Sequence, residues 1–148
     1  MQTYTQILYQ VTFHTRNNEK TLLSEKREEL YSYIAKVISN KNCHAYRIGG
    51  IEDHIHIILR LHPNIALSKL IKDIKMSSSS MIKRNNIFPN FYGWQKGFGA
   101  FTYSEDALLN LIKYVDKQEE HHKNESSKEE LIKTLQSHNV DFNEKYLF

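Results

Sequence analysis

The stretch Gly49-Gly50-Ile51-Glu52-Asp53-His54-Ile55-His56-Ile57-Ile58-Leu59-Arg60-Leu61 decides the fold, because its second half alternates between apolar and polar side chains as a β-strand does. One face of this strand is apolar throughout and holds Ile55, Ile57, Leu59 and Leu61. The side chains of His54 and His56 point to the opposite face, with their Cα atoms ~7 Å apart. Two imidazoles at that separation can bind one metal ion, although two histidines on a sheet surface without metal would give the same pattern. In a regular strand Asp53 points away from both histidines.

The composition of the 148-residue chain is that of a soluble globular protein, with 40% hydrophobic and 25% charged residues. We expect residues 1–148 to form a single domain. The net charge of +3 permits a polyanionic partner without requiring one. The single cysteine, Cys43, excludes an internal disulfide framework and favours the reducing cytoplasm. No apolar run is long enough to span a bilayer, so we expect no membrane association.

The hydrophobic pattern predicts an α+β fold. Strands are expected over residues 4–14, 43–48, 54–61 and 94–103, and helices over residues 24–39 and 67–84. The order β-α-β-β-α-β is typical of a ferredoxin-like antiparallel sheet with both helices on one face. Its strand order would be 4-1-3-2, which places the His-x-His strand in the middle and leaves the opposite face free for a site.

Two helices are expected after this core of about residues 1–104. The first covers about residues 105–123, with Ser104 as its N-cap. The second starts at the capping box Ser127-Lys128-Glu129-Glu130 and ends near residue 137, within a C-terminal region of about residues 127–148. The aromatic tail at residues 142–148 is expected to dock on the domain.

Tyr114 and Gln118 lie one turn apart on the same side of the predicted helix at residues 105–123. A carboxamide oxygen can complete a metal site begun by two imidazoles and leave coordination positions open. Such a donor set suits Mg²⁺ or Mn²⁺ better than structural zinc. A phenol is a poor nucleophile at neutral pH without a metal or a base, so Tyr114 alone predicts no chemistry.

Four segments in the same order resemble the small single-tyrosine HUH transposases of bacterial insertion sequences, including the relatives associated with repetitive extragenic palindromes. They are Gly49 to Leu59, Leu70 to Lys75, Trp94 to Phe101 and Tyr114 to His122. The resemblance implies that His54, His56 and Gln118 bind a divalent metal and that Tyr114 is the nucleophile. It also implies cleavage and rejoining of single-stranded DNA at hairpin ends of a mobile element through a 5′-phosphotyrosine. A homodimer with shared active sites is implied as well.

Basic side chains of the predicted helix at residues 67–84 are candidates for contacts with the DNA backbone, with a solvated lysine face as the alternative. These candidates are Lys69, Lys72, Lys75, Lys83 and Arg84. Two other functions remain open at this stage. One is a non-catalytic nucleic-acid-binding protein that stacks bases on Tyr9 and Phe13 of the sheet. The other is a metal-dependent phosphodiesterase that forms no covalent adduct.

Overall fold

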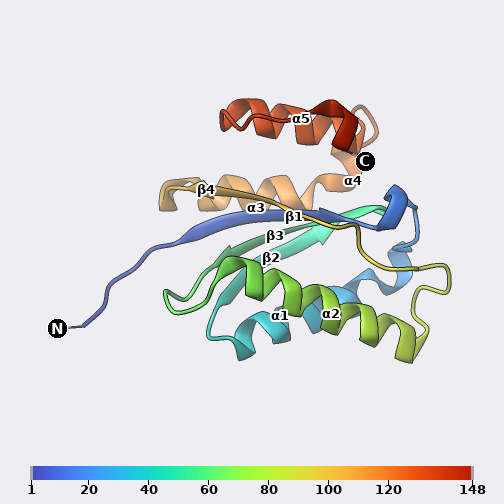
Figure 1. The fold of residues 1–148 in the computed structure, drawn as a ribbon, viewed down its shortest axis with the longest axis horizontal. Helices are drawn as coiled ribbons and strands as arrows, with labels where there is room; N and C mark the ends of the chain where they lie inside the picture. Colours follow the sequence, from blue (N-terminus) through green and yellow to red (C-terminus); the bar gives the residue numbers. More distant parts are fainter. Residues whose placement is uncertain (1, 148) are drawn as a thin grey trace.

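The computed structural model, which describes residues 2–147, contains a four-stranded antiparallel sheet (Figure 1). Its strands are β1 (Leu8–His14), β2 (His44–Gly50), β3 (His54–Arg60) and β4 (Gly99–Tyr103). They lie in the order β2-β3-β1-β4, so the predicted order and the central position of the His-x-His strand are confirmed. The ferredoxin-like α+β class is confirmed with them.

Helices α1 (Ser24–Asn40) and α2 (Leu67–Asn85) cover one face of the sheet (Figure 1). The main hydrophobic core lies between them and the sheet, as the amphipathic patterns of both helices predict. Its central side chains from β3, α1 and α2 are Ile55, Ile57, Leu59, Leu30, Ile34, Leu70 and Ile74. The apolar face of the His-x-His strand is therefore buried, and the histidines point to the other side.

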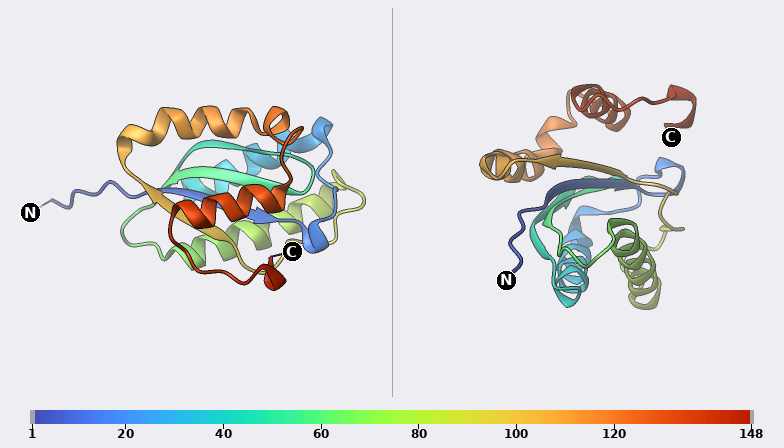
Figure 2. Two further views of the ribbon diagram at one scale, coloured as in Figure 1. Left: turned by 90° about the horizontal axis from the view of Figure 1, so that it is seen from above. Right: turned by 60° about the vertical axis from the view of Figure 1, so that its left-hand side comes forward.

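The opposite face is covered by C-terminal helices (Figures 1 and 2). Leu111 and Val115 of α3 (Leu108–Asp116) pack on Leu8 and Ile58 in a second, smaller hydrophobic cluster. A methyl group on Gly49 of β2 would lie only 2.7 Å from Val115 Cγ1, so this glycine permits the close approach of α3. Helices α4 (Gln118–His121) and α5 (Ser127–Ser137) follow, and α5 lies above the sheet beyond α3.

Two predicted strands are longer than those observed. β1 begins at Leu8 rather than at residue 4, and β4 begins at Gly99 rather than at Trp94. Trp94 forms one isolated bridge to Thr15, because its side chain is used in the core instead. Its ring lies edge-on to Phe13 with centroids 4.9 Å apart, and its Nε1 donates to Ser78 Oγ at 3.0 Å. Ser78 of α2 is fully buried at this contact.

The prediction of one continuous helix over residues 105–123 is wrong. A 3₁₀ turn, η2 (Glu105–Ala107), precedes α3, and the chain leaves helical geometry at Lys117, with φ −99° and ψ 16°, before α4. The amide of Lys117 donates to the carbonyls of Lys113 and Tyr114, which closes α3. Tyr114 and Gln118 therefore lie on different helices, and the break turns the buried Gln118 side chain toward the sheet. Ser104 makes no side-chain cap, because its hydroxyl donates to Asp106.

The predicted bounds of α5 are confirmed, but its capping residue was misassigned. Ser126 Oγ accepts from the amide of Glu129 at 3.1 Å, so Ser126 is the N-cap. Ser127 and Glu130, which a capping box would use at the helix end, point inward and are buried. Ser127 instead contacts Asp53, and Glu130 contacts the histidines of β3.

The C-terminal tail follows α5 and includes a short 3₁₀ turn, η3 (Glu144–Tyr146). Phe142 and Leu147 border a cavity of about 240 Å³ together with Phe13 and Leu135. Phe148, the last residue of the tail that was expected to dock, lies outside the described residues. A second 3₁₀ turn, η1 (Arg16–Asn18), follows β1. Within residues 2–147, none of the helices combines the length and the apolar character that crossing a bilayer requires.

Candidate active site

The two histidines of β3 face the C-terminal helices across the sheet. In the antiparallel register His54 pairs with His14 and His56 pairs with Thr12, so all four side chains share one face. His54 is 0% exposed and His56 is 3% exposed, because α4 and α5 cover them. The polar face of the sheet is thus the floor of a buried site.

The His54 ring is held by Asp53 and Ser127. Nδ1 of His54 lies 2.7 Å from Asp53 Oδ1, and Ser127 Oγ donates to the same carboxylate at 3.1 Å. The expectation that Asp53 points away is wrong, because the chain bends at residues 52–53 and β3 starts only at His54. Burial opposes the charge on Asp53, but the hydrogen bond with His54 and its positive charge lower the pKa of that carboxyl.

Gln118 reaches the same face from the start of α4. Its Oε1 lies 3.1 Å from His54 Nε2 and 3.0 Å from His122 Nε2. Its Nε2 donates to Glu130 Oε2 at 3.0 Å, which orients the amide so that the oxygen faces the imidazoles. Gln118 is 1% exposed, so its contacts with the imidazoles and Glu130 are shielded from solvent.

Tyr114 enters the site from the last turn of α3. Its ring lies edge-on to His56 with centroids 5.8 Å apart, and its hydroxyl donates to Glu130 Oε2. Burial first, and then the negative charge of Glu130, raise the pKa of the Tyr114 phenol above its usual value. A cleft of about 460 Å³ between α3 and α5 leads to Tyr114 and Glu130 from outside.

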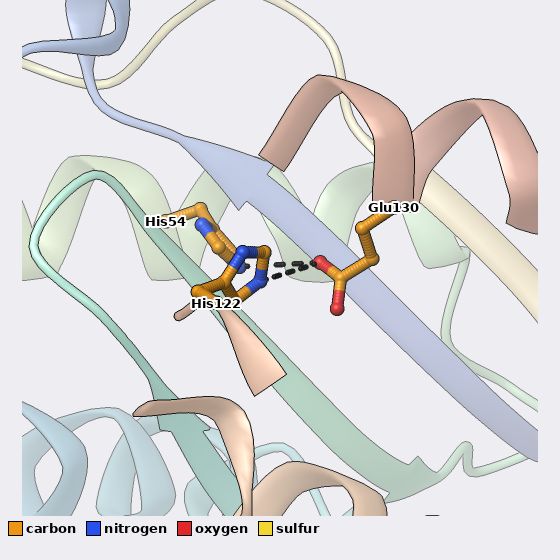
Figure 3. Close-up of side chains that lie close together, drawn as sticks. All are labelled: His54, His122 and Glu130. Atoms are coloured by element: carbon orange, nitrogen blue, oxygen red, sulfur yellow. Dashed lines mark ion pairs between the residues drawn. The ribbon is translucent and has the colours of Figure 1, made fainter. Parts of the chain in front are cut away.

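Glu130 of α5 is the residue on which the site converges, and the sequence interpretation missed it. Its Oε1 lies 3.4 Å from His54 Nε2 and 3.2 Å from His122 Nε2 (Figure 3). The same oxygen lies 3.1 Å from His56 Nε2. Burial opposes ionisation, but hydrogen bonds from these three imidazoles hold the pKa of Glu130 far below its usual range. Its place in an apparent capping box hid this role, and no local pattern distinguishes an inward from an outward glutamate there.

Two of these imidazoles, His54 and His56, have pKa values shifted in opposite directions. Although burial opposes it, the hydrogen bonds to Asp53 and Glu130 raise the pKa of His54 to about 9. Burial lowers the pKa of His56 despite the nearby Glu130. Nδ1 of His56 lies 3.1 Å from Gln10 Nε2, and Gln10 in turn accepts from the Tyr103 hydroxyl.

The structure therefore brings His54, His56, Gln118 and Tyr114 together within one chain. It adds His122 and Glu130, neither of which the sequence analysis singled out. One donor atom each from His54, His122 and Glu130 lie within 4.8 Å of one another, a grouping that could hold a metal ion (Figure 3). Imidazole, carboxamide and carboxylate donors are a chemically suitable set for Mg²⁺ or Mn²⁺.

The candidate DNA-binding residues belong to α2, which lies across the sheet from α3, α4 and α5 (Figure 1). Lys69 pairs with Asp73 at 2.9 Å, and Lys75 donates to the Gln95 carbonyl at 2.9 Å, so both have partners within the chain. Lys72 and Arg84 are exposed to solvent. Lys75 and Lys83 line a groove of about 600 Å³, which also contains Arg16, Lys96 and Tyr92.

The aromatic side chains of β1 are not available for stacking on bases. Phe13 is 1% exposed and belongs to the main core, and Tyr9 packs against that core. Both lie on the face that α1 and α2 cover. The non-catalytic binding mode that depended on these two rings loses its support.

Two solved structures are similar to this chain. A candidate transposase from Deinococcus radiodurans R1 superimposes with a TM-score of 0.61 at 17% identity, covering 78% of this chain and 93% of its own. The REP-associated tyrosine transposase bound to a REP hairpin gives a TM-score of 0.61 at 18% identity, covering 82% of this chain and 72% of its own. The fold is thus one that transposases use. Among curated proteins, none matches the chain.

The sequence itself matches the family described as "Transposase IS200 like" over residues 3–118. This span contains all four strands, both histidines of β3, Tyr114 and Gln118. The chain belongs to the IS200-like transposase family. The resemblance noted from its sequence segments is confirmed, and α5 with Glu130 lies beyond the matched span.

Proposed function

We propose that this transposase cleaves and rejoins single-stranded DNA through a covalent 5′-phosphotyrosine at Tyr114, with Mg²⁺ or Mn²⁺ bound by His54, His56 and Gln118. One observation carries the proposal. In a member of a transposase family, a tyrosine hydroxyl, an imidazole pair and a carboxamide oxygen meet within one chain around a single carboxylate. A surface tyrosine and two structural histidines would have no reason to converge in this way.

The three proposed ligands are held by their surroundings. Asp53 fixes the His54 ring, Gln10 contacts the His56 ring, and Glu130 orients the Gln118 amide. Bound there, a divalent cation would polarise the scissile phosphate as a Lewis acid. The protein's part is to keep these donors preorganised and shielded from water.

Tyr114 is positioned for covalent catalysis. Its phenol oxygen attacks phosphorus, the bond from phosphorus to the 3′ oxygen breaks, and the departing oxygen takes a proton from solvent. The phenol proton leaves along its hydrogen bond to Glu130 Oε2 and passes on to solvent. Because the phosphotyrosine retains the energy of the broken bond, a 3′ hydroxyl can reverse the step and join strands.

The DNA substrate we propose is a hairpin with a single-stranded flank. The similar REP-associated transposase is bound to a REP hairpin, which supports a substrate of this kind. The groove beside α2 gathers Arg16, Lys83 and Lys96 around the exposed ring of Tyr92. Positive groups with an aromatic ring suit phosphates and unpaired bases.

The arrangement supports cleavage by a tyrosine acting on the site of its own chain. A homodimer with shared sites would require Tyr114 to leave the Glu130 carboxylate and reach a second copy. Mixing Tyr114→Phe with His56→Ala protein tests this, since we expect each variant alone to be inactive. We expect no recovery of cleavage in the mixture, whereas recovery would establish sharing between chains.

The decisive experiment incubates the protein and Mn²⁺ with a labelled hairpin oligonucleotide that has a single-stranded flank, followed by denaturing electrophoresis. We expect a covalent protein–DNA adduct that Tyr114→Phe abolishes. Tyr33→Phe, a half-buried tyrosine of α1 on the other side of the sheet, is the matched control and should retain the adduct. Cleavage that persists in Tyr114→Phe would instead identify a phosphodiesterase, and binding without cleavage a non-catalytic protein.

A further inference from the structure

Two imidazoles of the site direct their Nε2 atoms into the same small volume. Nδ1 of His54 lies 2.7 Å from an oxygen of the Asp53 carboxylate, and Nδ1 of His122 lies 2.8 Å from the carbonyl oxygen of Glu125. Since both partners only accept hydrogen bonds, each Nδ1 holds the ring proton. In the neutral rings, both Nε2 atoms therefore offer lone pairs.

Both Nε2 atoms face the same two oxygens. Gln118 Oε1 lies 3.1 Å from Nε2 of His54 and 3.0 Å from Nε2 of His122. Glu130 Oε1 lies 3.4 Å and 3.2 Å from the same two atoms. The Gln118 amide is held in this orientation, because its NH₂ group donates to Glu130 Oε2. These four atoms therefore need positive charge among them, which protons on the imidazoles supply without metal and a bound cation would supply in their place.

The spacing of these atoms matches a coordination sphere. Adjacent ligands bound at about 2.1 Å are about 3.0 Å apart in octahedral geometry and about 3.4 Å apart in tetrahedral geometry. The four distances among His54, His122, Gln118 and Glu130 span 3.0–3.4 Å. We propose that Glu130 and His122 are ligands of the same divalent cation that His54 and Gln118 bind. This inference rests on the proposed function, whose metal site it extends.

The carboxylate changes the character of the site. His54, His56 and Gln118 are all neutral ligands, whereas Glu130 contributes one negative charge and a hard oxygen donor, which Mg²⁺ and Mn²⁺ prefer. Together with His122, these ligands would fill five positions of an octahedral sphere. One position remains for an oxygen of the scissile phosphate.

His56 can join this set through a change in one amide. In the present arrangement Gln10 Nε2 faces His56 Nδ1, so Nε2 of His56 donates to Glu130 Oε1 at 3.1 Å. A half-turn of the Gln10 amide lets its oxygen accept from Nδ1–H, and Nε2 then becomes a ligand. Tyr103, which now donates to Gln10, would then accept from the amide and donate to Nε2 of His138 at 3.0 Å.

The two new ligands follow the family-matched span, which ends at residue 118. Glu130 lies on α5. His138, directly after α5, packs on Phe101 of β4 with ring centroids 4.9 Å apart, so this end of the helix also contacts the sheet. A cation bound by residues of β3 and α5 would fasten this C-terminal helix over the active site. Metal binding should therefore slow hydrogen exchange of the α5 amides.

The test measures Mn²⁺ binding to the full chain by isothermal titration calorimetry, with manganese chloride alone and no DNA. We expect Glu130→Gln and His122→Asn each to weaken binding about tenfold or more, as removal of groups around a metal does. The matched controls are Glu129→Gln on the exposed side of α5 and His44→Asn at the exposed start of β2, which should bind like wild type. Melting curves without metal verify that each variant is folded.

Different outcomes separate the two proposals. If wild type binds Mn²⁺ and forms the DNA adduct while both variants bind Mn²⁺ within twofold of wild type, this inference fails and the proposed function stands. Tighter binding by Glu130→Gln would show that the carboxylate pairs with protonated imidazoles and competes with metal, which also overturns it. If wild type binds no Mn²⁺, the metal site of the proposed function fails together with the inference. If Mn²⁺ leaves the exchange rates of the α5 amides unchanged, the cation does not stabilise the position of this helix.

Discussion

The Asp53 carboxylate lies 2.7 Å from Nδ1 of His54 and holds the ring so that Nε2 faces the centre of the site. Ser127 at the start of α5 donates to the same carboxylate, so β3 and α5 meet at this pair. Asp53 is 5% exposed, and its hydrogen bonds are shielded from water. The orientation of the first histidine thus depends on a residue that does not itself reach the metal position.

Asp53→Asn should therefore weaken metal binding while leaving every proposed ligand in place. The amide that replaces the carboxylate is a poorer acceptor for Nδ1–H, so the ring loses orientation and basicity. We expect a 10- to 100-fold decrease in Mn²⁺ affinity by calorimetry. Glu52→Gln, one residue earlier in the same bend, is the control. An Asp53→Asn protein that binds Mn²⁺ as wild type does would show that the carboxylate does not position the ring.

The groove beside α2 should bind the phosphates of DNA. Lys83→Glu and Lys96→Glu each replace a positive charge in the groove by a negative one, so we expect weaker binding of a hairpin oligonucleotide. The plot of log Kd against log salt should become shallower by about 1 for each lysine–phosphate pair that a variant removes. Lys36→Glu on the exposed side of α1 is the control. Equal affinity and equal salt dependence in all three variants would place the DNA elsewhere.

His14 should make the metal-free protein sensitive to mild acid. Burial first, and then the positive charge of neighbouring His54, lower the pKa of His14 to about 3, although the charges of Asp53 and Glu130 oppose this. Below pH 6.5 the unfolded chain gains a proton that the native state cannot accept. This residue therefore removes about 1.4 kcal/mol of stability per pH unit as the pH falls from 6.5 toward 3.

Urea unfolding of wild type and His14→Gln between pH 7 and pH 5 checks this assignment. The variant lacks the titrating group, so its free energy of unfolding should fall less steeply with acid. Asp53 before β3, His54 and His56 of β3, and Glu130 of α5 face His14. They titrate in both proteins, so the difference between the two curves reports mainly on His14. Parallel curves would mean that His14 takes up its proton in the native state.

Gly49 should control the position of α3 and hence of the nucleophile. A methyl group at residue 49 would meet Val115 Cγ1 at 2.7 Å and the Val115 carbonyl oxygen at 3.0 Å, so the helix must move. We expect Gly49→Ala to lower the free energy of unfolding by about 1–3 kcal/mol, as overpacking does. Adduct formation should slow, because Tyr114 precedes Val115.

The double variant Gly49→Ala/Val115→Ala tests the cause of that effect. It removes the clash with Cγ1 but keeps the close approach to the carbonyl oxygen. We expect partial recovery of stability relative to the sum of the single changes. A Gly49→Ala protein that melts and reacts like wild type would show that α3 moves freely on β2.

Local alternation was enough to predict the sheet. Ile55, Ile57 and Leu59 lie on the core face because a strand sends every second side chain to the same side, whatever the rest of the chain does. The helical spacing of apolar residues in α1 and α2 then predicted two helices between the strands, an order that is typical of the ferredoxin-like topology. His54, His56, Gln118 and Tyr114 were found because they occur in short segments whose residue types resemble a known family.

Contacts between distant segments could not be predicted in this way. Glu130 meets His56 across 74 positions in the sequence, and no spacing rule relates the two. Asp53, Ser127 and His122 likewise show their roles only once the bend before β3 and the break at Lys117 turn their side chains inward. Periodicity determines which face of an element is buried, because that depends on local geometry alone. Which polar groups share a buried volume depends on how separate elements pack, and only the folded chain decides it.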